Sequence, residues 1–159
     1  MDTENSLRIQ DGITRLLEDP LVKLLSTNSS LSNIQLETLL IDVLSENIYG
    51  MPIKYEDKAK LRLINNKISR GAFNRTLKQA NNNIKKSVNT ILLLGYLGIL
   101  DSPQLQPFIE ISTKLNTYIK NYFNVWNKQQ KDKIENDNIN DIYYFKNELI
   151  ETIGRFLST

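Results

Sequence analysis

Apolar residues recur every three or four positions along most of the chain, which is the spacing of amphipathic helices. In residues 7–25 the pattern is interrupted at Asp19-Pro20, because proline kinks or breaks the interior of a helix. A helix that is broken or kinked at this proline is therefore predicted. With only 6 glycines and 4 prolines in 159 residues, the composition also favours helices over a turn-rich sheet protein.

The next predicted helix is marked at both ends. Ser32 and Gln35 fit a capping box at its start. Gly50 and Pro52 end it shortly after Asn47, because glycine permits the turn and proline disfavours helix in the residue before it. Its apolar spacing predicts a core face made of Leu36, Leu39, Leu40, Val43 and Leu44.

The middle of the chain predicts two helices separated by a turn. Residues 54–63 would form a short helix or a strand, and their pattern favours neither. Ser69 is placed as the N-cap of a helix. Its buried face would be Phe73, Leu77 and Ala80. Asn81–Asn83 predicts a turn, since asparagine tolerates left-handed and turn conformations.

The second of these helices is amphipathic and ends near Gly95 and Gly98. Its apolar side carries Ile84, Val88, Ile91 and Leu92, and its polar side carries Lys85, Lys86 and Asn89.

The last third predicts two helices separated by a polar stretch. Ser102-Pro103 begins a long helix to about Asn127, unless Pro107 delays its start. Residues 127–141 are polar and charged, and would form a linker or a solvated helical stretch. The final helix covers about 142–157 with the apolar stripe Ile142, Phe145, Leu149, Ile153 and Phe156. This stripe folds back on its own chain or pairs with a second copy; we favour a homodimer, since the spacing approximates a coiled-coil seam.

The chain has no cysteine and no histidine. A disulfide framework, a thiolate nucleophile, an imidazole base and the usual zinc sites are therefore excluded. Neither glycine-rich phosphate motif, that of the NTPases or that of the dinucleotide-binding proteins, occurs. Carboxylates such as Asp132, Glu135 and Asp137 lie in the polar stretch with nothing predicted to desolvate them. We expect no enzymatic activity, no cofactor, no metal and no small-molecule substrate.

The formal charge of +2 conceals a segregated distribution. Residues 1–53 hold 3 basic and 8 acidic residues, residues 54–90 hold 10 and 2, and residues 91–159 hold 7 and 8, so the net charges are −5, +8 and −1. No acidic residue occurs between Lys58 and Leu100. Such a basic stretch is typical of proteins that neutralise phosphates. A surface that serves only solubility, or one that docks an acidic protein partner, would show the same distribution.

The basic stretch coincides with the predicted helix, turn and second helix. A helix-turn-helix module needs this arrangement, because its first helix braces the second, which enters the major groove. Lysine can reach guanine or phosphate, and asparagine can pair with adenine. Phosphate contacts are predicted for Lys67, Arg70, Arg75 and Lys78, and base contacts for Asn82, Lys85, Lys86 and Asn89.

Residues 68–101 resemble helix-turn-helix and winged-helix transcription regulators, particularly small archaeal ones. The resemblance lies in Ala80, in the Ser87-Val88 pair, and in the Leu-x-x-x-Gly-aliphatic pattern of Leu94–Leu100. The sequence departs from these regulators in having three asparagines and no glycine in the turn, and no legible β-hairpin wing after Leu100. The resemblance implies a regulator that binds double-stranded DNA.

Together these patterns predict an all-α protein with a helix-turn-helix, winged-helix-like core, an additional N-terminal helix and long C-terminal helices. The expected segments are an N-terminal helical part at 1–30, a DNA-binding core at 31–101 and dimerising helices at 102–159. We expect sequence-specific or architectural binding of double-stranded DNA in the cytoplasm, by a transcription regulator or by a plasmid or viral replication or partition protein. No secretory signal opens the sequence, and its longest apolar run, 91–100, is too short for a membrane anchor.

Overall fold

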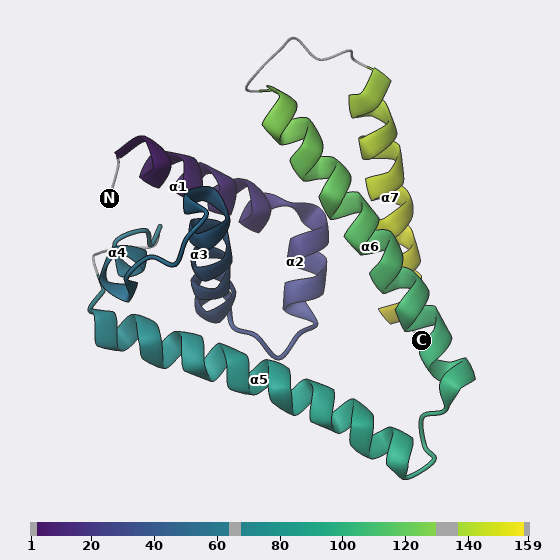
Figure 1. Cartoon of the computed structure of the whole chain (residues 1–159). Coiled ribbons are helices and arrows are strands. Elements are labelled where there is room, and N and C mark those ends of the chain that lie inside the picture. Colours follow the sequence, from purple (N-terminus) through teal and green to yellow (C-terminus); the bar gives the residue numbers. More distant parts are fainter. Residues whose placement is uncertain (1–2, 64–67, 130–136, 158–159) are drawn as a thin grey trace. The chain divides into compact units, whose positions relative to one another are not determined.

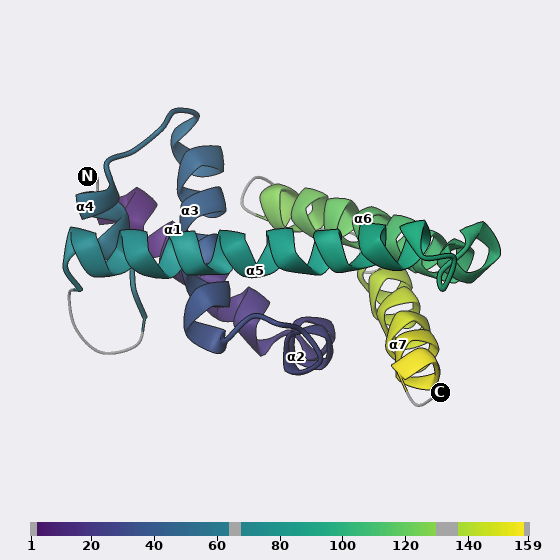
Figure 2. The same ribbon diagram turned by 90° about the horizontal axis from the view of Figure 1, so that it is seen from below.

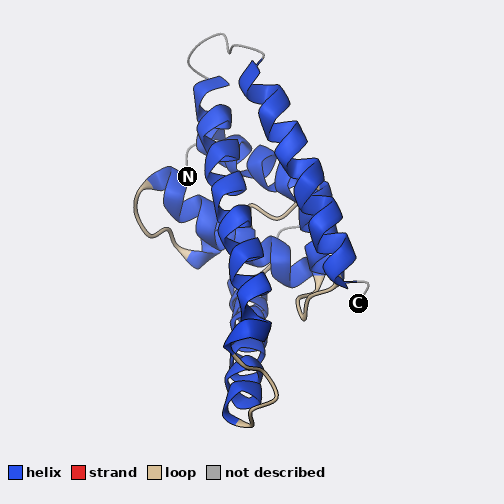
Figure 3. Ribbon diagram, turned by 90° about the vertical axis from the view of Figure 1, so that its right-hand side faces the viewer, coloured by secondary structure: helices blue, strands red, loops and turns tan. Residues whose placement is uncertain are grey.

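The computed structural model describes residues 3–63, 68–129 and 137–157, and within these ranges it contains seven helices and no strand (Figure 1 and Figure 3). Side chains are described in the same ranges apart from 104, 121–143 and 156–157. The helices are α1 (Thr3–Glu18), α2 (Pro20–Thr27), α3 (Asn33–Tyr49), α4 (Tyr55–Ala59), α5 (Arg70–Tyr96), α6 (Ser102–Gln129) and α7 (Asp137–Leu157). The all-α prediction is confirmed. The winged-helix core is not confirmed, because a wing needs strands and the described residues contain none.

The chain divides into two compact units, Met1–Leu92 and Leu93–Thr159. The boundary lies inside α5. The first unit therefore holds α1 to α4 and most of α5, and the second holds the end of α5 together with α6 and α7.

α1 and α2 are separate helices because of Asp19 and Pro20. Pro20 stands at the start of α2, where its missing N–H removes no helical hydrogen bond. The Asp19 carboxylate caps α2 by accepting a hydrogen bond from the backbone N–H of Leu21 at 2.8 Å. The predicted break at this proline is confirmed. The two helices contribute Ile9, Ile13, Leu16 and Leu21 to the core of the first unit.

α3 begins and ends as predicted but buries a different face. Ser32 and Gln35 form the capping box, and Gly50 ends the helix with a φ of +65°. Its buried residues are Glu37, Thr38, Ile41, Leu44 and Ser45. The other predicted core residues are half-buried in the case of Leu36, Leu39 and Leu40, and 53% exposed in the case of Val43. α3 packs on α1 through a mixed face, because the polar groups on that face find partners.

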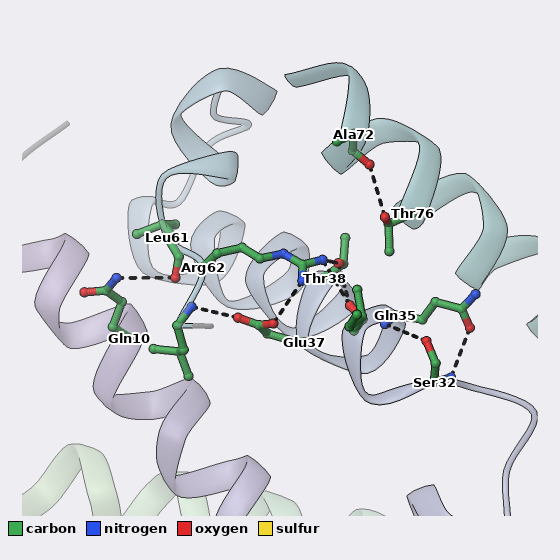
Figure 4. A network of polar contacts seen from close by, with 11 residues as sticks. Gln10, Ser32, Gln35, Glu37, Thr38, Leu61, Arg62, Ala72 and Thr76 are labelled. Atoms are coloured by element: carbon green, nitrogen blue, oxygen red, sulfur yellow. Dashed lines mark hydrogen bonds and ion pairs between the residues drawn. The ribbon is translucent and has the colours of Figure 1, made fainter. Parts of the chain in front are cut away.

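Glu37 and Thr38 of α3 have partners in the segment after α4 (Figure 4). Glu37 is fully buried; one of its carboxylate oxygens accepts from Arg62 at 3.2 Å and the other from the backbone N–H of Leu63 at 2.7 Å. Arg62 also donates to the Thr38 hydroxyl and to the Ile34 carbonyl. Removal of one partner from such a buried pair leaves the other charge buried without compensation. These contacts hold residues 62 and 63 against α3, and the structure shows helix α4 in the segment 54–63.

The predicted turn at Asn81–Asn83 is wrong, because α5 continues through it without a break, as Figure 2 shows. Asparagine in a helix costs only about 0.5 kcal/mol relative to alanine. Asn83 gains partners in return: its side-chain amide donates to the Ser30 carbonyl at 3.0 Å and to the Gln35 side-chain oxygen at 3.1 Å. The predicted helix after Ser69, the predicted turn and the second predicted helix are therefore one helix, α5.

In the second unit, α6 and α7 form an antiparallel hairpin (Figure 1). α6 begins at Ser102, as predicted, and continues through Pro107. α7 begins at Asp137, earlier than predicted, so part of the expected polar linker is helical. Residues 130–136 of that linker lie outside the described chain.

The apolar stripe of α7 is used within the chain. Leu149 and Ile153 are buried and Phe145 is half-buried, while Tyr118 of α6 is buried in the same unit. An ion pair of 3.5 Å between Lys114 and Glu148 joins the two helices. The side chains of Ile142 and Phe156 lie outside the described part. The burial of Leu149 and Ile153 agrees with the alternative in which the stripe folds back on its own chain.

Candidate nucleic-acid interface

α5 begins at the predicted N-cap. The Ser69 hydroxyl accepts a hydrogen bond from the backbone N–H of Ala72 at 3.1 Å, and the Ser69 carbonyl accepts one from that of Phe73 at 3.0 Å. The first contact satisfies an N–H group that has no backbone partner inside the helix, and the second is the first backbone hydrogen bond of the helix. The first residue of the helix, Arg70, therefore has a fixed place at its start.

The predicted nucleic-acid contacts in the described chain all lie on α5, and all are exposed. They are Arg70, Arg75, Lys78, Asn82, Lys85, Lys86 and Asn89. Lys67 lies outside the described residues.

The absence of a turn brings most of these residues onto one side of a single helix. At about 100° per residue, six of them fall within an arc of about 100°. We call this set the basic face; it consists of Arg75, Lys78, Asn82, Lys85, Lys86 and Asn89. Arg70 lies outside this arc. With a rise of about 1.5 Å per residue, the basic face extends about 21 Å along the helix.

The opposite side of the first half of α5 packs against the rest of the first unit and fixes how the helix is rotated. Phe73, Leu77 and Ala80 are buried, as predicted, and the ring of Phe73 lies 6.2 Å from that of Tyr55. Further along, the hydroxyls of Ser87 and Ser30 are 3.1 Å apart, next to the Asn83 contacts. Because these anchors lie on one side of the helix, the basic face points away from the rest of the first unit.

The charge of α5 has one sign. The helix carries five basic residues and no acidic one. In the part of the chain that the structure describes, none of the four cations on the basic face forms an ion pair with a carboxylate. Their charge is available to a ligand that carries negative charge along its length.

The structure adds Gln79 to the residues that sequence reasoning identified. Gln79 is exposed and borders the basic face next to Lys86, and glutamine can form the same paired hydrogen bonds with adenine as asparagine. The continuous helical spacing from Arg75 to Asn89 could have identified it. The predicted turn interrupted that spacing, so the sequence did not indicate that Gln79 and Lys86 are neighbours on one helix.

Among the described residues, no group of three or more acidic side chains is placed to hold a metal ion. None of the helices in that part of the chain combines the length and the apolar character needed to cross a bilayer. Comparison with protein families, with characterised proteins and with solved structures finds no match to this chain.

Proposed function

We propose that this chain binds double-stranded DNA through the basic face of α5. The observation that carries the proposal is the alignment of four cations and two asparagines on the outer side of one continuous helix. Its inner side is held by Phe73, Leu77 and Ala80.

Each kind of residue on the basic face has a role in this mode of binding. The major groove of B-DNA, about 12 Å wide, admits one α-helix. Arg75, Lys78, Lys85 and Lys86 would contact phosphates or guanine, while Asn82 and Asn89 have the donor and acceptor pair that matches adenine. The absence of any carboxylate on α5 removes the repulsion that a phosphate backbone would otherwise meet.

The proposed binding element is one inserted helix. The first half of α5 braces the helix through its buried residues and also contributes Arg75 and Lys78 to the contact surface. This arrangement needs neither a turn at Asn81–Asn83 nor a wing. Regulation of transcription and a role in replication or partition would both use the same face.

Replacement of two cations tests the assignment. Lys85→Ala/Lys86→Ala should weaken binding to a random-sequence duplex and flatten the log-log salt slope by about 2, because each lysine releases about one counterion equivalent. The measurement is fluorescence anisotropy of a labelled duplex over a salt series.

The matched control removes the same charge elsewhere. Lys23 in α2 and Lys120 in α6 are exposed lysines outside α5, so Lys23→Ala/Lys120→Ala should leave the slope within about half a unit of the natural value. Equal losses in both variants would show general attraction only and contradict a site on α5. Intact folding with no duplex affinity in the natural chain would favour an acidic protein partner instead.

A further inference from the structure

The end of α5 and the start of α6 present an exposed apolar surface. It consists of Leu93, Tyr96, Leu97, Ile99 and Ile109, which are between 55% and 89% exposed. We call this surface the apolar tip. Tyr96 is the most exposed of the five, at 89%.

The apolar tip is an ordered part of the fold. Gly98 ends α5 with a φ of +67°, a conformation that glycine adopts without strain. The backbone N–H groups of Ile99 and Leu100 both donate to the Leu94 carbonyl, at 3.0 and 3.2 Å. The exposed side chains are therefore presented by a capped helix end.

We propose that the apolar tip is the contact surface between two copies of this chain. From the exposed fractions, its apolar area is roughly 500 Å². A standard interface buries about 800 Å² on each partner, of which about 60% is apolar. The tip therefore supplies about the apolar area that one side of such an interface needs.

The charge of the surrounding segment favours a second copy over a lipid surface. Between Ser87 and Ile109 the chain has one charged residue, Asp101, and no lysine or arginine. A helix that docks on anionic lipid carries basic residues at its apolar border, and this segment has none. A nearly uncharged surface can meet an identical surface across a two-fold axis without repulsion between like charges.

This contact uses none of the residues of the basic face of α5. A dimer would carry two basic faces. The contact is independent of the proposed DNA binding, because Lys85→Ala/Lys86→Ala removes no residue of the tip and should leave the dimer intact.

Light scattering of the full chain tests the proposal. The natural chain should have a molar mass of about 37 kDa, twice the 18.4 kDa of one chain. Tyr96→Asp/Ile99→Asp should give the monomer mass, with dimer affinity reduced on the order of 100-fold, because each charge would be buried at the contact. A milder variant, Tyr96→Ser/Leu97→Ser, should weaken the dimer in the same direction if the first variant fails to fold.

Two controls make the result decisive. Leu7→Asp/Tyr144→Asp replaces exposed apolar residues elsewhere, at 62% and 77% exposure, and should remain a dimer. Circular dichroism should show equal helicity in all variants. A natural chain that is monomeric at about 100 μM, or folded tip variants as dimeric as the natural chain, would overturn the proposal. Sedimentation of a monomeric natural chain with anionic vesicles, lost in the tip variant, would assign the surface to lipid and overturn it as well.

Discussion

Lys58 is a buried ammonium group that two carboxylates of α3 hold in place. Its Nζ lies 2.7 Å from Asp42 Oδ1 and 2.7 Å from Glu46 Oε1, and 5.3 Å from the centre of the Tyr55 ring. Burial alone lowers the pKa of Lys58, because it disfavours the charged form. The hydrogen bonds to Asp42 and Glu46 outweigh this effect, and the net pKa is raised above the ordinary 10.5. The fold therefore stabilises the charged lysine.

The raised pKa predicts a loss of stability at alkaline pH. The contribution of Lys58 is fully present below about pH 10.5, where the lysine of the unfolded chain is still protonated, and it declines as the pH rises through the folded-state pKa. Lys58→Met should lower the urea midpoint at about pH 8, and the difference from the natural chain should shrink above about pH 10.5. Urea unfolding followed by circular dichroism measures both. A difference that stays constant into the alkaline range would contradict this role.

Single residues differ in how far the sequence could predict them. Phe73, Leu77 and Ala80 are buried as expected, because one spacing defines their face and no other face of the first half of α5 is apolar. α3 has leucines on one side and a mixed set on the other. Its buried side depends on Glu37, which is paired with Arg62, 25 residues away in the sequence. Helical spacing contains no information about such a partner.

At the scale of the element, α5 is continuous through three asparagines, and this continuity aligns the basic face. The N-cap at Ser69 and the glycine at the end of the helix were both predictable, because each is a local signal with its own geometry. The continuity of the helix between these two ends could not be predicted from local signals. The Asn83 contacts, and the burial of Phe73, Leu77 and Ala80 before the asparagines, oppose the small cost of three asparagines in a helix.

Substitution of Asn82 tests the continuity directly. Asn82 is exposed, so Asn82→Ala should stabilise the chain by about 0.5 kcal/mol through helix propensity alone. Asn82→Pro should destabilise it by about 3 kcal/mol, since proline removes a helical hydrogen bond and clashes with the preceding turn. Thermal unfolding measures both changes.

The equivalent change at Asn89, Asn89→Ala, serves as the reference, because Asn89 lies where a helix was predicted from the start. The two alanine variants should shift the melting temperature equally. A proline at position 82 that costs less than about 0.5 kcal/mol would indicate a turn there and contradict the continuous helix.

At the scale of the whole molecule, a nearly neutral total charge coexists with a strongly basic segment. Residues 54–90 carry a net charge of +8, and the acidic residues that balance it lie elsewhere in the sequence. The helical fold could be predicted from hydrophobic spacing. The rotation of α5, which decides where its cations point, depends on Tyr55, Ser30 and Gln35, and these contacts were not readable from the sequence.

The salt dependence of duplex binding by the natural chain tests the central claim most directly. Four cations on the basic face predict a log-log slope of affinity against salt near −3.6, about −0.9 for each phosphate neutralised. Anisotropy of a labelled random-sequence duplex over about 50 to 300 mM salt measures this slope. A slope near −3.6 that falls to about −1.8 in Lys85→Ala/Lys86→Ala would support binding through α5. A slope near zero, or no binding at the lowest salt, would contradict it.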